Sequence, residues 1–277
     1  MSKVCIVVSK KCEVGRNILP VLQEIGNFKE SGSIFEGNKV YENDYAFLAV
    51  CNKLHIYAEN INPPGSHIVF LSTHKSEKNI KCFTVHPVGN FGKAELGGKD
   101  FTLVKCSALL NRALFDSLRK FYEESMLKEE FALSLEVTHH GPYTEKPVAF
   151  MEIGSTTKEW HNEKALKLLA NAALEGIKNF YEMKRDAYNV ALCCGGNHYA
   201  AKFTRVLLKQ NDLAYGHLIP KYHLENISIE IFREAVEKTV EGVNFVLVDR
   251  KGSNSVQREK IREFCKILNL KYRQTQK

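Results

Sequence analysis

The stretch that sets the fold class runs from Val148 to Tyr181 and reads VAFMEIGSTTKEWHNEKALKLLANAALEGIKNFY. Its first six residues are mostly apolar, which is typical of a strand covered on both faces. Thr156 is followed three residues later by Glu159, the pattern of a capping box, and predicts the start of a long helix over Lys158–Tyr181. A second apolar run, Val190–Cys194, follows that helix. A strand, a helix and a strand in succession favour an α/β layered sheet.

The rest of the chain repeats this alternation. The other predicted strands are Lys3–Val8, Tyr45–Cys51, His67–Leu71, Lys81–Val85, Phe131–Val137 and Asn244–Val248. The other predicted helices are Asn17–Gln23, Cys106–Leu127, Ile229–Glu241 and Ser255–Leu268. No repeat or linker-like tract divides the sequence, so we expect one α/β domain over residues 1–277, with a mostly parallel or mixed central sheet. The turn-rich stretch His86–Asp100 is the expected functional loop.

Composition and cysteine usage indicate the compartment. The chain has 277 residues, of which 44% are hydrophobic, and its apolar runs are far shorter than the roughly 18 residues that span a bilayer. The apolar stretch near the N-terminus is too short for the core of a signal peptide. The eight cysteines form no CxxC pair, which excludes cysteine-based zinc fingers and favours free thiols in a reducing compartment. We therefore expect a soluble, cytoplasmic protein.

The positive charge lies at the C-terminal end. Arg250–Lys277 holds nine basic and two acidic residues, which equals the whole net charge of +7. Arg258, Arg262 and Lys266 are spaced to lie on one face of the predicted C-terminal helix, about residues 255–268. A basic end on a neutral body favours contact with a polyanion, of which nucleic acid is the commonest. The alternative is a solvated helix face that pairs with neighbouring glutamates.

Histidines follow the ends of four predicted strands, each within four residues of the last strand position. They are His74, His86, the pair His139–His140, and His198. If these strands run parallel, the histidines converge in the crevice beyond the carboxyl ends of the strands, where α/β sheets bind ligands. The adjacent pair would point in two directions from an extended backbone, so we expect only one of its rings to face the site.

Grouped neutral imidazoles suit Zn²⁺, whose catalytic sites hold three protein ligands and leave a position for water. Zinc would lower the pKa of that water and polarise a carbonyl, as hydrolysis of an ester or an amide requires. Without metal, the same cluster could act as general acid and base. Glu136 and Glu152 lie near strand ends, and each is either a buried partner of a histidine or a solvated carboxylate.

Five motifs together resemble the archaeal and plant D-aminoacyl-tRNA deacylases, the second deacylase type, in the same order over nearly the whole chain. They are THKS (73–76), TVHPVGNFG (84–92), EVTHHGP (136–142), PVAFMEIGSTTKEW (147–160) and GGNHYAAKFT (195–204). The chain departs from that family at Asn197–Ala201, where the family has a further glycine and a proline. His198 and Tyr199 are retained, so the departure concerns the rigidity of the loop.

The resemblance implies a phosphorylase/hydrolase-like α/β/α fold and a zinc-dependent enzyme that cleaves the ester of D-aminoacyl-tRNA. We separately expect a monomer without an obligate protein partner. The catalytic residues that the resemblance implies are His86, His139, His140 and His198. The candidate zinc ligands are His74, His86, His140 and His198, with ligand and acid–base roles not separated. The candidate substrate-binding residues are Asn90, Gly141, Ser155, Thr156, Tyr199, Arg258, Arg262 and Lys266.

Two other classes of function stay open. A zinc-dependent amidohydrolase or peptidase of a small substrate would use the same histidine cluster but would not need the basic C-terminal end. A non-catalytic RNA-binding protein would explain the charge but not the histidines after the strands.

Overall fold

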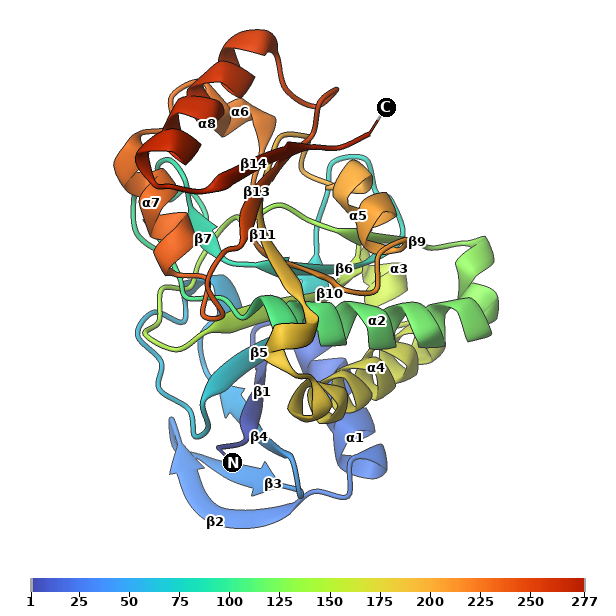
Figure 1. Ribbon diagram of the computed structural model, residues 1–277. Coiled ribbons are helices and arrows are strands. Elements are labelled where there is room, and N and C mark those ends of the chain that lie inside the picture. Colours follow the sequence, from blue (N-terminus) through green and yellow to red (C-terminus); the bar gives the residue numbers. More distant parts are fainter. Residues whose placement is uncertain (1, 277) are drawn as a thin grey trace.

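The apolar runs of the sequence form two β-sheets in the computed structural model, which describes residues 2–276 (Figure 1). The larger sheet contains, in spatial order, β2 (Lys29–Phe35), β3 (Asn38–Glu42), β4 (Ala46–Cys51), β1 (Val4–Ser9), β5 (His67–His74), β10 (Val148–Gly154), β6 (Cys82–Pro87) and β9 (Ala132–Leu135). The smaller, parallel sheet contains β12 (Leu213–Ile219), β11 (Asn189–Cys194), β13 (Phe245–Val248) and β14 (Lys271–Gln274). A two-stranded sheet pairs β7 (Gly89–Asn90) with β8 (Thr102–Leu103).

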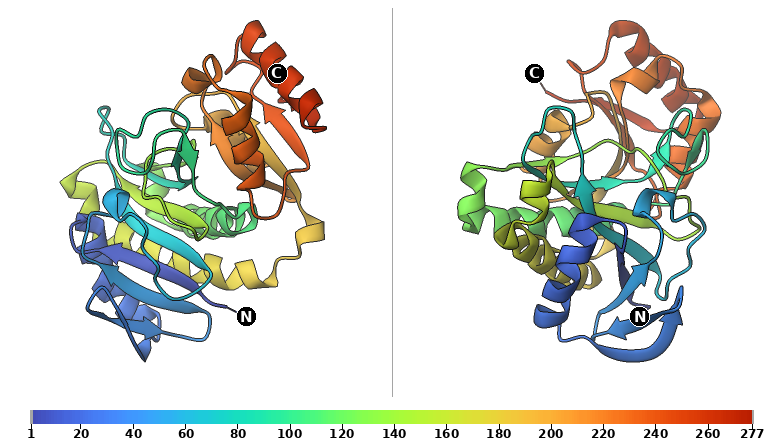
Figure 2. Two further views of the ribbon diagram at one scale, coloured as in Figure 1. Left: turned by 90° about the vertical axis from the view of Figure 1, so that its left-hand side faces the viewer. Right: turned by 180° about the vertical axis from the view of Figure 1, so that it is seen from behind.

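Helices connect and cover these strands. The α-helices are α1 (Glu13–Ile25), α2 (Ala108–Glu124), α3 (Thr157–Trp160), α4 (Glu163–Glu182), α5 (Ala201–Leu207), α6 (Lys221–Leu224), α7 (Ile229–Glu237) and α8 (Ser255–Ile267). Short 3₁₀ turns are η1 (His55–Tyr57), η2 (Met126–Glu129) and η3 (Arg185–Ala187). The N-terminal strands and the C-terminal helices lie at opposite ends of the molecule (Figure 2). Between residues 2 and 276, no helix is long and apolar enough to cross a membrane.

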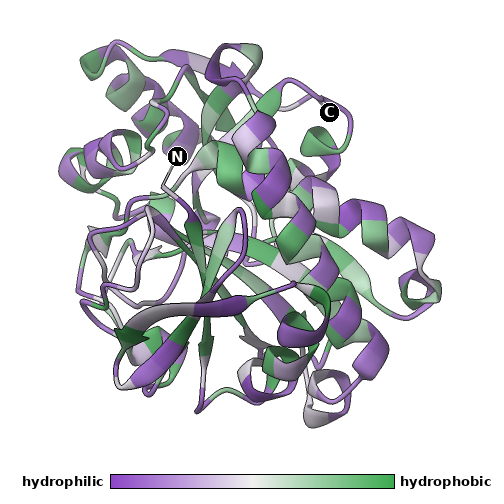
Figure 3. Ribbon diagram, turned by 90° about the horizontal axis from the view of Figure 1, so that it is seen from below, coloured by the Kyte–Doolittle hydropathy of each residue, from purple (hydrophilic) through white to green (hydrophobic). Residues whose placement is uncertain are grey.

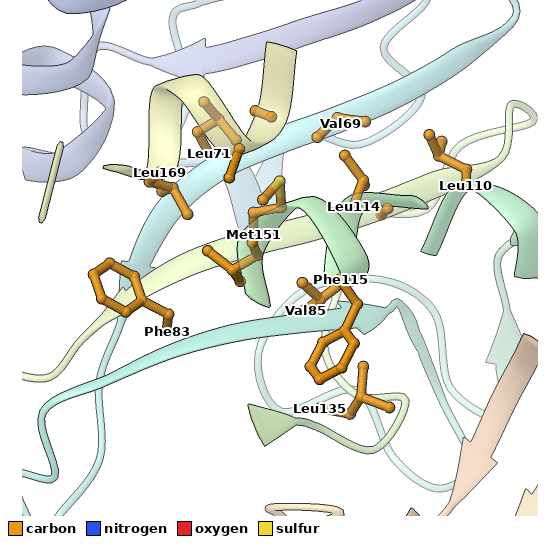
Figure 4. Packing of buried hydrophobic residues seen from close by; sticks show 14 of the residues in the cluster. Val69, Leu71, Phe83, Val85, Leu110, Leu114, Phe115, Leu135, Met151 and Leu169 are labelled. Atoms are coloured by element: carbon orange, nitrogen blue, oxygen red, sulfur yellow. The ribbon is translucent and has the colours of Figure 1, made fainter. Parts of the chain in front are cut away.

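One face of the larger sheet packs against α1, α2 and α4. Strand alternation places Val69, Leu71 and Met151 on this face, where they meet Leu114 and Leu169 of the helices (Figure 4). Burial of each such side chain contributes about 1.5–3 kcal/mol. Seen from below, the strands of the interior are mostly hydrophobic, whereas the surface helices mix both kinds of residue (Figure 3).

The opposite face of the larger sheet carries both aromatic and buried polar side chains. Phe70 of β5 and Phe150 of β10 stack there with ring centroids 4.8 Å apart, and loops rather than long helices cover them. Continuing along the same strands in steps of two leads to His74 and Glu152. The alternation that fills the core therefore also aims these two polar side chains away from the helical layer.

The two sheets are joined at the segment that follows β9. The amide of Val137 donates to the carbonyl oxygen of His198 at 3.1 Å, and the amide of Thr138 donates to that of Leu218 at 2.9 Å. Glu136 forms an isolated antiparallel bridge with Tyr199. This joint brings the loop after β11 against the edge of the larger sheet.

The mixed α/β fold is confirmed, with three differences in detail. The layers surround two sheets rather than one central sheet, and helices cover both faces only of the smaller one. The single predicted helix over Lys158–Tyr181 is two helices, because Asn162 caps α4 anew, although the capping box at Thr156 is confirmed. Strands β2, β3, β7, β8, β12 and β14 were not predicted; β2 is largely exposed, β3 is half-buried, and both carry too few apolar residues to form a run. One domain over residues 1–277 stays a prediction.

Candidate active site

Histidine and glutamate side chains gather at the joint between the two sheets. The cluster consists of His74, His86, His139, His140, His198, Glu136 and Glu152. Its members come from β5, β6, β10, the segment after β9, and the loop between β11 and α5. We call this set the histidine–glutamate cluster.

Glu152 is the carboxylate at the bottom of the cluster. One of its oxygens accepts a hydrogen bond from Ser72 Oγ at 2.6 Å, and the other lies 3.3 Å from His74 Nδ1 and 3.6 Å from His86 Nε2. Burial opposes ionisation of Glu152, but the two histidines outweigh it and hold its pKa well below the usual range. Burial likewise favours neutral His74 and His86, yet the glutamates raise the pKa of both rings above the ordinary value. Glu152, His74 and His86 therefore form a buried charge set, in which the negative carboxylate and the two positive rings stabilise one another.

Glu136 is fully buried and faces three imidazole rings. Its oxygens lie 3.1 Å from His74 Nδ1, 3.0 Å from His198 Nε2 and 3.5 Å from His139 Nε2. Within residues 2–276, none of these approaches has the angles of a hydrogen bond, and both oxygens of Glu136 are left without a hydrogen-bond partner. A buried carboxylate without a partner is costly, so this position suits a bound cation.

His86, His139 and His140 share one arrangement. Each Nδ1 lies against a backbone carbonyl oxygen, which can only accept, so Nδ1 carries a proton. In the neutral ring, Nε2 therefore keeps its lone pair. Burial, with the neighbouring histidines, lowers the pKa of His140 to about 3 and that of His139 well below the ordinary value. Ligand atoms of the three rings lie within 4.8 Å of one another. Histidines that bind metal are oriented in this way.

Two features of the cluster therefore suit a metal ion: the kinds of ligand atom that it offers, and the buried oxygens of Glu136 that have no hydrogen-bond partner. Two further groups meet the same 4.8 Å limit: His74 with Glu136 and His198, and His86 with Glu136 and Glu152. Imidazole nitrogens and carboxylate oxygens are ligands that zinc takes in three-ligand catalytic sites.

A pocket of about 340 Å³ opens onto the cluster. Leu54, Ile56 and Leu96 form its apolar side. Five members of the cluster contribute to its polar side: His74, His139, His140, Glu152 and His198. His55 of η1 also lines it, is buried with Nδ1 unpartnered, and lies 5.6 Å from the Phe150 ring. The pocket thus combines convergent polar groups with an apolar wall, as sites for small organic groups do.

The sequence matches the family model described as D-aminoacyl-tRNA deacylase over residues 62–273. The chain belongs to this family. A D-aminoacyl-tRNA deacylase of Pyrococcus furiosus is 34% identical over 276 residues, covering 96% of this chain and 98% of the relative. A crystal structure of a conserved protein of unknown function superimposes with a TM-score of 0.88 at 31% identity, covering 99% of this chain and 95% of that one. Futalosine hydrolase of Helicobacter pylori gives a TM-score of 0.37 at 12% identity, covering 66% of this chain and 99% of that one.

The residues matched to the deacylase family include every histidine of the cluster, and the structure brings all of them together. The expected cause of this convergence is wrong, because β6 runs antiparallel to β10 and not parallel. His86 is therefore not in a loop that reaches solvent but inside β6, fully buried, opposite Phe150. The rings lie together because their side chains point to the same face of the sheet, and not because their strands all end at the same edge.

The expectation that only one ring of His139–His140 faces the site is also wrong. The backbone at His140 has a φ of 45°, so the pair is not extended. The two rings lie with their centroids 4.3 and 5.0 Å from that of His86. Both therefore enter the cluster.

The candidate substrate-binding residues separate into two groups. Tyr199 lies in the cluster, with its hydroxyl 2.8 Å from His74 Nε2. Asn90 instead donates to the backbone carbonyls of residues 97 and 99, and Ser155 to that of residue 80. Thr156 caps α3. A direct role for these three in binding substrate stays a prediction.

The basic stripe on α8 is partly engaged within the chain. The guanidinium of Arg258 donates to the carbonyl oxygens of residues 250 and 253, and that of Arg262 pairs with Glu259, while Lys266 is exposed. The pairing with Glu259 is the one that a solvated helix face would make. Binding of tRNA by this stripe stays a prediction. Lys277, the last residue of the basic C-terminal end, lies outside the described residues.

Sequence reasoning missed His55 and left both glutamates undecided. His55 lies four residues after the end of the predicted strand Tyr45–Cys51, the same spacing as His198 from its strand, so the spacing could have found it. It was passed over because it lies in none of the five motifs. Glu136 and Glu152 are buried at the centre of the cluster, which settles the choice in favour of buried partners.

Proposed function

We propose that this chain hydrolyses the ester between a D-amino acid and the 3′ end of tRNA, releasing both, in a proofreading and detoxifying role. The observation that carries the proposal is the pocket in which the histidine–glutamate cluster faces an apolar wall. An aminoacyl ester offers both sides a partner: a polar carbonyl for the cluster and an amino-acid side chain for Leu54, Ile56 and Leu96. Membership of the deacylase family supports the same substrate class.

We propose Zn²⁺ as the cofactor. His86, His139 and His140 would hold it through Nε2, and His74, Glu136 and His198 form a second group of the same kind. Bound zinc would supply a Lewis acid for the ester carbonyl and a water of lowered pKa. The backbone carbonyls on the Nδ1 side fix the orientation of the first three rings.

His198 is the residue that transfers protons. Its side chain is 39% exposed, against 3% for His74 and 0% for His86, so it can reach both the ester and solvent. Its Nε2 lies 3.0 Å from a Glu136 oxygen. The carboxylate would stabilise the imidazolium that forms when the ring takes a proton from water, before that proton passes to the departing 3′ oxygen of the tRNA.

Selection of the D-amino acid would come from exclusion. D and L esters carry the same groups, so a pocket can reject one only by placing atoms where its side chain would lie. Leu54, Ile56 and Leu96 would receive the side chain of the D-amino acid. The backbone at Gly141, which packs against the carbonyl oxygen of Ile56, would exclude the side chain of the L-amino acid.

Paired D- and L-aminoacyl-tRNA, incubated with the purified protein with and without a chelator, test the proposal. We expect the D ester to be cleaved at least about tenfold faster than the L ester, since excluding a misplaced group costs more than about 1.4 kcal/mol. The chelator should abolish cleavage, and zinc should restore it. Ester hydrolysis is followed by acid-precipitable label.

Each proposed function gives a different result. Equal cleavage of both esters would contradict the deacylase assignment, and turnover only of small amides would favour an amidohydrolase. Binding of tRNA with no cleavage and no stoichiometric zinc would favour an RNA-binding protein.

Gly141→Ala should reduce kcat/KM by about tenfold, because a Cβ there would lie 2.6 Å from the carbonyl oxygen of Ile56 and closer still to the amide of Gly98. One of these neighbours must move, and Ile56 lines the pocket. Gly32→Ala is the control: it has a φ of 76° but open space, so it should lower stability without changing kcat/KM. An unchanged kcat/KM in the Gly141 variant would show that this contact does not shape the pocket.

We further propose that the protein acts as a monomer in the cytoplasm, where aminoacyl-tRNA is made and used. The eight cysteines support a reducing compartment, since all are buried and unpaired.

A further inference from the structure

A groove of about 340 Å³ runs between α5 and β14, outside the active-site pocket. Phe245 and Leu247 of β13, both almost fully buried, line its apolar floor. Lys202, Arg205 and Lys209 line it from the side of α5, and Arg273 lines it from β14. No acidic residue is among those that line the groove in the described chain.

These cations are not neutralised within the chain. Among residues 2–276, no Asp or Glu lies within 4.0 Å of the charged nitrogens of Lys202, Arg205, Lys209 or Arg273. The guanidinium of Arg273 lies 4.2 Å from the centroid of the Phe245 ring, which holds it at the groove. Four unpaired cations around one groove create a site for a polyanion.

The groove starts next to the active site. His198 and Lys202 are four residues apart, so their Cα atoms are separated by no more than about 14 Å. Lys202, Arg205 and Lys209 follow at i, i+3 and i+7, which places them on one side of α5 and the turn after it. They span about 10 Å along the helix, the rise of about three nucleotides in one strand of a nucleic-acid helix.

We propose that this groove binds the phosphates of the acceptor end of tRNA and so delivers the 3′ ester to His198. The inference rests on the proposed function, because that function supplies the RNA. The α5 cations would contact successive phosphates, and Arg273 would contact the strand from the other side. Such contacts hold the backbone without reading bases, so they serve any tRNA equally.

The groove is favoured over the α8 stripe by its free charge and by its position. Arg262 is already paired with Glu259, whereas no cation of the groove has an ion pair in the described residues. Lys202 of the groove donates to the carbonyl oxygen of Gln276, as Arg258 does to two carbonyls, and neither bond neutralises a charge. The α5 cations also belong to the helix that the His198 loop enters.

Three triple variants test the assignment. The groove variant is Lys202→Gln/Arg205→Gln/Lys209→Gln, and the rival is Arg258→Gln/Arg262→Gln/Lys266→Gln. The charge-matched control is Lys164→Gln/Lys167→Gln/Lys178→Gln, three exposed lysines on one side of α4, which packs on the sheet face opposite the cluster. Each is assayed for kcat and KM with one D-aminoacyl-tRNA between 50 and 200 mM salt, and for thermal unfolding.

For the groove variant we expect KM to rise about tenfold or more, kcat to stay within about twofold, and the log–log salt slope to shrink by about two. The α4 variant should match wild type in all three. Wild-type KM and salt slope in a folded groove variant would overturn the inference, as would a KM increase confined to the α8 variant. If wild type cleaves no D-aminoacyl-tRNA, the proposed function fails instead, and direct binding of uncharged tRNA to the same variants still decides the groove.

Discussion

His198→Ala should lower kcat for D-aminoacyl-tRNA by about 100-fold or more and leave the protein as stable as wild type. The large loss follows because removal of a group that transfers protons typically costs a factor of about 10² to 10⁴. The small effect on stability follows because the side chain is 39% exposed and its removal leaves no buried cavity. Single-turnover hydrolysis measures the first effect and thermal unfolding the second.

Two further variants serve as comparisons for His198→Ala. His86→Ala should lose activity and also stability, because His86 is fully buried beside Glu152. His161→Ala should change neither, since its ring is 54% exposed and contacts only Glu13 and the helix backbone outside the cluster. If His198→Ala retained more than about a tenth of wild-type turnover, the proton-transfer role would be excluded.

Glu152→Ala should lower the free energy of unfolding by about 3–5 kcal/mol in chelator-treated protein, the usual cost of removing one partner of a buried ion pair. The variant leaves His74 and His86 buried with only one of the two carboxylates that raise their pKa, and it leaves Ser72 without its acceptor. Urea unfolding measures the change, and zinc content should fall in parallel.

Two more variants show whether the loss of stability in Glu152→Ala comes from the charge and from its burial. Glu152→Gln keeps an acceptor for Ser72 and should lose less stability while still losing zinc. Glu175→Ala removes a carboxylate from a half-exposed pair with Lys120 and should change stability by less than about 1 kcal/mol. A Glu152→Ala protein as stable as wild type would show that the buried charge set does not support the fold.

The sequence supported the fold class and the membership of the cluster because both depend on local patterns. Apolar runs of five to seven residues predict buried strands wherever they fall, and the motifs around His86, His139 and His198 are short and contiguous. Neither inference needs the order in which strands pair.

What the sequence could not supply depends on pairing and on backbone detail. Nothing in the residues around His86 states that β6 runs antiparallel to β10, so the ring was placed in a loop instead of inside the sheet. The positive φ at His140 is set by its surroundings and not by a glycine. His55 becomes part of the pocket only because its loop folds back over Phe150, a contact across 95 positions of sequence.

The joint between the two sheets has a consequence for the order of folding. Glu136 and His198 are held together by backbone pairing between segments more than 60 residues apart, so closing that loop is among the later and entropically more demanding steps. A nascent chain released before His198 has emerged holds Glu136 but lacks the group that we propose transfers protons. We therefore expect translation products that end before His198 to leave aminoacyl esters uncleaved.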